Sequence, residues 1–227
     1  MTYKSLQKSL MDKLEKDAGK SSTIVTMLSD YANDNQISLA LVYFLPKALT
    51  EKIYAKLINP LEKADSQQYY YLKQSLHITI QPIRVIHSPP NFTVEDIEKV
   101  RVSFSKIIPK LFTINFSLEG LLKLPTSLAL RAYADVNLGK LILALEKVLS
   151  EIGVPNDKKY LSGKVFWGNS TLCRYTSLPN EAFLRTIEKL KDVKLGLLKV
   201  ESVSLITTNP VVAPDKTQII ETYHLKP

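Results

Sequence analysis

The sequence SLHITIQ at residues 75–81 alternates polar and apolar residues over seven positions. Because successive side chains of a β-strand point to opposite faces, this pattern predicts a strand with its aliphatic residues in the core. The polar face then carries His77 and Thr79 side by side. Imidazole exchanges protons near neutral pH, and a hydroxyl can hydrogen-bond an anionic oxygen. Since an isolated His-x-Thr also arises by chance, its interpretation depends on the rest of the chain.

A comparable pattern occurs at residues 166–174, which read FWGNSTLCR. Strict alternation places Asn169 and Thr171 on one face, together with Trp167 and Cys173. A polar residue followed two positions later by threonine therefore occurs at both His77 and Asn169. The repetition carries more weight than either pattern alone.

The elements around these two patterns also occur twice in the same order. A strand buried on both faces is expected at residues 37–45, because nearly every position there is apolar. The periodicity of the remaining residues predicts helices at 49–61, 93–107, 138–152 and 180–191, and strands at 75–83, 111–118, 128–134, 164–176, 198–207 and 217–225. A duplicated α+β module explains this order, and duplication tends to place equivalent strands around a shared groove.

Residues 1–36 precede the duplicated region and contain apolar residues at helical spacing. We expect one helix at residues 4–18 and a second from Ser21 to Tyr31, before a turn at residues 33–35. This helical extension would either pack on the core or bind a partner.

Composition narrows the class of protein. The 227 residues are 45% hydrophobic and 23% charged, which is typical of a globular protein. The longest apolar stretch, residues 37–45, is too short to cross a bilayer, and the first residues do not resemble a secretory signal. A single cysteine forms no internal disulfide, which fits the cytosol. The net charge of +8 falls entirely on residues 37–227 and favours an anionic ligand, although mild basicity alone also promotes solubility.

Two short motifs and the order of elements carry a resemblance to a known family. The stretch from His77 to Ile80 resembles the first H-x-T-x motif of the 2H phosphoesterase superfamily, which includes bacterial 2'-5' RNA ligase-like proteins and cyclic phosphodiesterases. The sequence TLCR ending at Arg174 is similar to the tail of the second motif, and the last strands with Tyr223 resemble those of the family. The resemblance implies a duplicated, bilobal α+β fold with antiparallel sheets around a central groove. Residues 37–227 would form this domain, with lobes at 37–110 and 111–227 between which strands can be exchanged.

One departure from the family falls on the chemistry, because Asn169 stands where the second histidine is expected. In the family, one histidine is thought to activate the attacking water or hydroxyl and the other to protonate the leaving oxygen, while the threonines hold the phosphate. The resemblance implies that His77 is the remaining acid or base and that Thr79, Asn169 and Thr171 hold the phosphate. An amide can donate a hydrogen bond to a phosphate oxygen but cannot shuttle a proton. His77 alone would support slow turnover, or none.

Four further residues near the second motif have alternative interpretations. Arg174 suits phosphate geometry, but strict alternation puts it on the face opposite Asn169, so either a bulge redirects it or it has a surface role. Trp167 and Tyr175 would stack on a base at the rim of the groove, or fill the core. Alternation places Cys173 on the groove face, where we expect it to pack rather than act as a nucleophile.

The remaining histidines suggest no second catalytic group. His87 and His224 lack any surrounding motif, and we expect both to be surface or strand residues. Three scattered histidines without clustered cysteines or carboxylates give no metal-site spacing. We therefore expect neither a metal nor another cofactor.

The sequence thus supports three functional hypotheses. The first is a 2H-type phosphodiesterase that acts on RNA ends or small nucleotides with 2',3'-cyclic phosphates or 2'-5' linkages. The second is a catalytically silent relative that binds such a ligand. The third is a scaffold that recruits a protein partner through residues 1–36. We expect a monomeric cytoplasmic protein that does not bind membranes.

Overall fold

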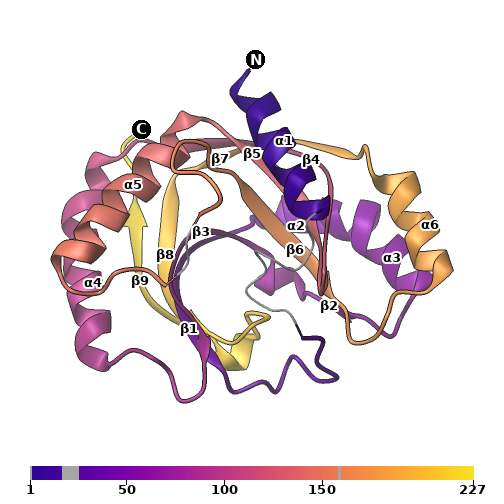
Figure 1. The fold of residues 1–227 in the computed structure, drawn as a ribbon, viewed down its shortest axis with the longest axis horizontal. Helices are drawn as coiled ribbons and strands as arrows, with labels where there is room; N and C mark the ends of the chain where they lie inside the picture. Colours follow the sequence, from indigo (N-terminus) through magenta and orange to yellow (C-terminus); the bar gives the residue numbers. More distant parts are fainter. Residues whose placement is uncertain (1, 17–25, 158–159) are drawn as a thin grey trace.

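The computed structural model describes residues 2–16, 26–157 and 160–227, which form two antiparallel sheets flanked by helices (Figure 1). The strands of the first sheet lie in the order β3 (His77–His87), β1 (Ile37–Phe44), β8 (Ser202–Thr208) and β9 (Gln218–His224). Those of the second sheet lie in the order β2 (Tyr69–Tyr70), β6 (Gly168–Arg174), β5 (Ser127–Ala134), β4 (Ile114–Leu124) and β7 (Lys194–Val200).

The two sheets repeat one arrangement, which confirms the duplicated α+β fold. Strands β3, β1, β8 and β9 correspond in order to β6, β5, β4 and β7, and β2 adds an edge strand beside β6. Strands β8 and β9 come from the end of the chain but complete the sheet that β1 began. The C-terminal half of the sequence therefore contributes strands to both sheets.

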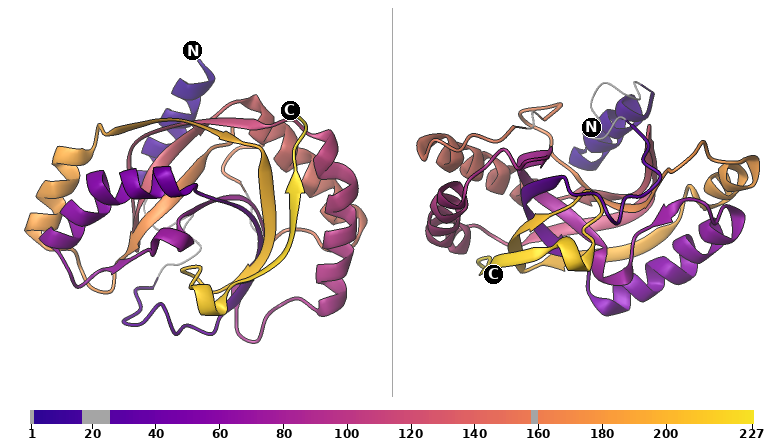
Figure 2. Two further views of the ribbon diagram at one scale, coloured as in Figure 1. Left: turned by 180° about the vertical axis from the view of Figure 1, so that it is seen from behind. Right: turned by 90° about the horizontal axis from the view of Figure 1, so that it is seen from below.

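The helices lie at the two sides of the paired sheets (Figure 2). Helices α4 (Val94–Ile107) and α5 (Val136–Glu151) pack together on one side, and α3 (Asn59–Ala64) and α6 (Glu181–Leu190) on the other. The expected helix at 49–61 is present as α2 (Lys47–Ile53), a π-helical turn (Tyr54–Ile58) and α3. None of the helices in the described ranges is both long and apolar enough to span a bilayer.

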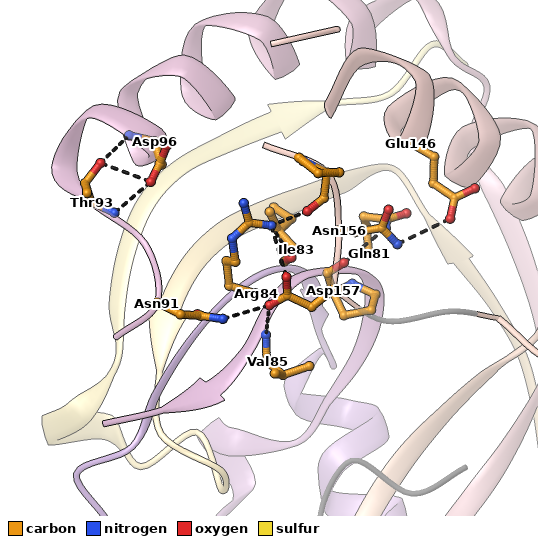
Figure 3. Close-up of polar contacts among 12 residues, drawn as sticks. Gln81, Ile83, Arg84, Val85, Asn91, Thr93, Asp96, Glu146, Asn156 and Asp157 are labelled. Carbon is orange, nitrogen blue, oxygen red and sulfur yellow. Dashed lines mark hydrogen bonds and ion pairs between the residues drawn. The ribbon is translucent and has the colours of Figure 1, made fainter. Parts of the chain in front are cut away.

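Capping residues explain several helix boundaries. Thr93 and Asp96 form a reciprocal capping box at the start of α4 (Figure 3). The Asn180 side chain accepts the backbone N–H of Phe183 at the start of α6. Gly153 follows α5 with a φ of 74°, the left-handed conformation expected of a glycine after a helix.

Two sequence predictions about secondary structure were wrong. Residues 194–208 form two strands, β7 and β8, instead of the single predicted strand at 198–207. β7 lies at the edge of its sheet, and its Leu197 is 88% exposed. Polar and apolar residues therefore do not alternate regularly along this strand. The second helix of the extension falls partly on residues 17–25, outside the described residues, and residues 26–36 form bends and turns.

The first helix of the extension, α1 (Tyr3–Lys16), packs on the second sheet through β4 and β5. Met11 is fully buried there with Leu122, Ala129 and Tyr133. The apolar face of α1 is thus covered by the protein's own sheet.

Candidate phosphodiester-binding groove

The two motif strands lie against each other where the sheets meet. A Cβ atom added at Gly168 would lie 2.8 Å from Cγ2 of Ile78 and 3.0 Å from Cε1 of Phe116. Gly168 is the neighbour of Asn169 in β6, and Ile78 is the neighbour of His77 in β3. The contact between Gly168 and Ile78 therefore lies between the two polar patterns. The absence of a side chain at Gly168 allows β3 and β6 to pack this closely.

We expect Gly168→Ala to lower the free energy of unfolding by about 1–3 kcal/mol, because the added methyl group would overpack this contact. The measurement is the urea midpoint of unfolding. Gly163→Ala is the matched control, since a Cβ there meets no atom within 4 Å. Equal midpoints for the two variants would contradict the close packing of β3 and β6.

A β-bulge interrupts each motif strand one residue after its threonine. In β3, Val42 pairs with Thr79 and Leu41 with Gln81, so Ile80 is the extra residue. In β6, Leu172 is the extra residue, because Ala129 pairs with Thr171 and Leu128 with Cys173. Each bulge reverses the alternation of the residues that follow it.

The bulge at Leu172 decides between the two interpretations of Arg174. It brings Arg174 to the face of Asn169 and Thr171, and all three line one cavity. Strict alternation was wrong for Cys173 and Tyr175, which belong to the core. Cys173 is fully buried, and burial raises the pKa of its thiol to about 12, which agrees with a packing role. Tyr175 is only 6% exposed and packs edge-to-face on Phe183, so of the two positions considered for it, the rim and the core, it occupies the core.

The cavity has a volume of about 290 Å³ and is lined by five polar residues of the two motifs. Its motif residues are His77, Thr79, Asn169, Thr171 and Arg174. Trp167 also lines the cavity. His87 and His224 are exposed at the ends of β3 and β9, and neither lines it.

The hydrogen bonding of His77 defines which ring nitrogen can act as a base. Its Nδ1 lies 2.8 Å from the backbone oxygen of Ser75. Because a carbonyl oxygen only accepts hydrogen bonds, Nδ1 carries the proton and Nε2 keeps the lone pair. Burial lowers the pKa of His77 from its ordinary 6.5, and the nearby charge of Arg174 lowers it further, while the bond to Ser75 opposes the shift. This lowered pKa favours the neutral form of the imidazole.

Arg174 is held by a tyrosine that sequence analysis missed. The Nε of Arg174 donates to the hydroxyl of Tyr71 at 3.3 Å, and this hydroxyl donates to the backbone oxygen of Pro210 at 2.9 Å. Tyr71 is buried, and its ring lies 6.3 Å from that of His77. The run of three tyrosines at 69–71 was the only signal in the sequence, and it did not distinguish Tyr71 from its neighbours.

A second arginine that lines the cavity, Arg84, is paired with a carboxylate. The Nη1 of Arg84 donates to Asp157 at 3.3 Å and to the backbone oxygen of Pro155. Asp157 also accepts the Val85 amide at 3.2 Å and the Asn91 side chain at 2.9 Å (Figure 3). Asp157 belongs to the loop after α5, so its contacts with Arg84 and Val85 hold this loop against β3. In contrast, no carboxylate among the described residues forms an ion pair with Arg174, whose remaining N–H groups suit a phosphate.

The described ranges contain no group of three or more His, Cys, Asp or Glu side chains placed to hold a metal ion. The donors gathered in the cavity are hydroxyl, amide, guanidinium and imidazole groups. Such groups can bind the oxygens of a phosphate and move one proton.

Comparisons with known proteins give a consistent picture of the fold. No protein-family profile and no curated protein sequence matches the chain. A solved structure described as a phosphoesterase has a TM-score of 0.60 at 12% identity, covering 85% of this chain and 100% of that one. E. coli LigT complexed with NADP+ has a TM-score of 0.58 at 12% identity, covering 86% and 100%. E. coli LigT complexed with 3'-AMP has a TM-score of 0.57 at 13% identity, covering 85% and 100%. These likenesses define the architecture: the chain has the two-lobed α+β fold of the LigT-like 2H phosphoesterases.

Proposed function

We propose that this protein binds small nucleotides or RNA ends through a phosphodiester and hydrolyses the bond slowly, with His77 as the base. The ligands would be 2',3'-cyclic phosphates or 2'-5' linkages. The observation that carries the proposal is the common cavity of His77, Thr79, Asn169, Thr171 and Arg174. The complexes of E. coli LigT with 3'-AMP and ATP add support for a nucleotide ligand.

The groups in the cavity would have two roles, which are binding of the phosphate and transfer of a proton. The hydroxyls of Thr79 and Thr171, the amide of Asn169 and the guanidinium of Arg174 would hold the phosphate oxygens. The Nε2 of His77 would take a proton from water as the new P–O bond forms and the bond to the leaving oxygen breaks. Because Asn169 has no proton to transfer, the leaving oxygen would take its proton from solvent.

The test of this proposal is turnover and binding of a nucleotide panel by the purified chain. The panel contains nucleoside 2',3'-cyclic monophosphates and a 2'-5' dinucleotide, with the 3'-5' dinucleotide as a comparison. Products are separated by chromatography, and Kd is measured by calorimetry. We expect binding with slow hydrolysis of the cyclic phosphate or the 2'-5' bond. The absence of both binding and turnover would exclude the proposal.

The substitution at Asn169 specifically favours a second candidate, a binding protein that does not turn its ligand over. Loss of one general acid or base typically costs about 10²–10⁴ in rate. Nucleotide binding that saturates at low concentration, without any product after prolonged incubation, would identify this second function.

The rate of the proposed hydrolysis should depend on pH through His77. We expect kcat/KM to fall at acid pH with an apparent pKa below 6.5, because the cavity lowers the pKa of this imidazole. The rate should be independent of pH around neutrality, where Nε2 is already unprotonated. The measurement is kcat/KM across the acid and neutral range, and an acid limb centred at or above 6.5 would argue against His77 as the base.

The same shift makes His77 contribute to the pH dependence of stability. With its folded-state pKa below the unfolded value near 6.5, the unfolded chain binds the proton more readily. The contribution of His77 is therefore present above the unfolded pKa and is lost as pH falls through the folded pKa.

A further inference from the structure

The loop between β8 and β9, at residues 209–213, lines the cavity and accepts two buried hydroxyl groups. The hydroxyl of Tyr71 donates to the backbone oxygen of Pro210 at 2.9 Å. The hydroxyl of Ser75 donates to the backbone oxygen of Val212 at 2.7 Å. This loop of the first sheet is thus bonded to both hydroxyl-bearing residues.

Each of these two residues also contacts a motif residue. The hydroxyl of Tyr71 accepts the Nε–H of Arg174 at 3.3 Å, and the backbone oxygen of Ser75 accepts Nδ1 of His77 at 2.8 Å. The imidazole of the first motif and the cation of the second motif therefore depend on one common support, the loop at residues 209–213.

The loop is held in a single conformation by a buried side chain. Asn209 is 1% exposed, and its Nδ2 donates to the backbone oxygens of Tyr31 at 3.2 Å and Ala32 at 3.0 Å. Its Oδ1 accepts the backbone N–H of Ala213 at 2.9 Å. Val212 has a φ of 53°, a left-handed conformation that is rare for a β-branched residue and persists only where the surroundings impose it. The loop is therefore a rigid support.

Tyr71 is itself fixed on several sides. Its backbone N–H donates to the Leu172 oxygen of β6 at 3.0 Å, and its ring packs against those of Tyr69 and His77 at 6.0 and 6.3 Å. The residue is 1% exposed. The place of its hydroxyl, and with it the place of the Arg174 Nε, is thus set by β6 and the loop together.

The partner that Tyr71 offers to Arg174 is neutral. Arg84 and Arg131 each bind carboxylates, whereas in the described part of the chain no carboxylate lies within ion-pair distance of Arg174. A hydroxyl fixes the guanidinium without neutralising its charge. Because the bond is made through Nε, the Nη groups are left for the oxygens of a phosphate.

We infer that Tyr71 is a positioning residue that holds the guanidinium of Arg174 for phosphate binding, with residues 209–213 as its support. The inference rests on the proposed function. An unrestrained arginine side chain loses rotamer freedom when it binds a ligand, which weakens binding. Since Tyr71 restricts Arg174 before the ligand arrives, this loss is smaller. Tyr71 therefore acts on affinity for the phosphate, and not on proton transfer by His77.

The test replaces Tyr71 with phenylalanine, which keeps the ring and removes the hydroxyl. Kd for adenosine 2',3'-cyclic monophosphate is measured by calorimetry, and kcat and KM are measured from product formation. We expect Tyr71→Phe to raise Kd and KM about tenfold, because a hydrogen bond to a charged group is lost. The change in kcat should be much smaller, since His77 keeps its contact with Ser75.

Tyr70→Phe is the matched control. Tyr70 is the neighbour of Tyr71, and its hydroxyl also donates to a backbone oxygen, that of Asp65, at 2.7 Å. It does not line the cavity. Each variant loses one hydroxyl bonded to the backbone, so the urea midpoints of unfolding should fall by similar amounts. Only Tyr71→Phe should weaken nucleotide binding.

A double-mutant cycle with Arg174→Ala determines whether Tyr71 acts through the guanidinium. Arg174→Ala should itself weaken binding, and Tyr71→Phe should cause no further loss in this background. A purely structural role of the Tyr71 hydroxyl would give the same loss of affinity with and without Arg174.

The outcomes distinguish this inference from the function on which it rests. If the wild-type chain neither binds nor hydrolyses the cyclic nucleotide, the proposed function fails and the inference fails with it. If the wild-type chain binds the nucleotide and Tyr71→Phe has no more effect than Tyr70→Phe, Tyr71 is not a positioning residue and the proposed function stands. An equal loss from Tyr71→Phe in the wild-type and Arg174→Ala backgrounds would lead to the same conclusion.

Discussion

An Asn169→His variant is expected to hydrolyse 2',3'-cyclic nucleotides about 10²–10⁴ times faster than the wild-type chain. Asn169 and His77 line the same cavity, on strands that touch at Gly168 and Ile78. A histidine at position 169 would add the proton donor that an amide lacks, so the leaving oxygen would no longer depend on solvent for its proton. The measurement is kcat and kcat/KM under single-turnover and steady-state conditions.

The pH profile of the variant provides an independent readout. The wild-type rate should show only the acid limb of His77, whereas the variant needs one neutral and one protonated imidazole. Its profile should therefore become bell-shaped, with a new fall in rate at alkaline pH. Asn169→Gln is the matched control, because it keeps the amide and cannot transfer a proton. Unchanged turnover in Asn169→His, with nucleotide binding intact, would show that position 169 does not face the leaving oxygen.

The sequence predicted the duplicated architecture because the evidence for it is local. Hydrophobic periodicity and capping residues such as Thr93 and Asn180 define helices within a few residues of the chain. The repeated polar-x-Thr pattern then located His77 and Asn169 in corresponding strands, and both line the cavity.

The sequence did not predict which of the side chains after each threonine face the groove. Strict alternation assumes an uninterrupted ladder, whereas Ile80 and Leu172 are each an extra residue in a bulge. For this reason Arg174 lies in the cavity, and Cys173 and Tyr175 lie in the core. The bulges occupy the same place in both halves, so they belong to the repeated unit.

Contacts between distant parts of the chain were also beyond sequence analysis. Tyr71 reaches Arg174 across 103 positions, and Asp12 reaches Arg131 across 119. Neither pair has a spacing or a motif that could reveal it. These contacts hold two arginines near the second motif, Arg174 through a neutral hydroxyl and Arg131 through a carboxylate.

Replacing His77 with alanine is expected to lower the rate of hydrolysis by about 10²–10⁴, the usual effect of removing a general base. Nucleotide binding should change much less, because Thr79, Thr171 and Arg174 still line the cavity. The measurements are kcat/KM for a 2',3'-cyclic nucleotide and Kd for the corresponding product. His87→Ala is the matched control, since His87 belongs to the same strand but is exposed at its end.

The strongest form of this experiment repeats the substitution in the Asn169→His background. If the two imidazoles act as a base and an acid in one reaction, the gain at position 169 depends on the base at position 77. The double variant should then lose the gain from Asn169→His as well as the wild-type rate, and the two effects should not be additive. A double variant that keeps the accelerated rate would mean that the new histidine acts alone, and that His77 is not the base of the wild-type protein.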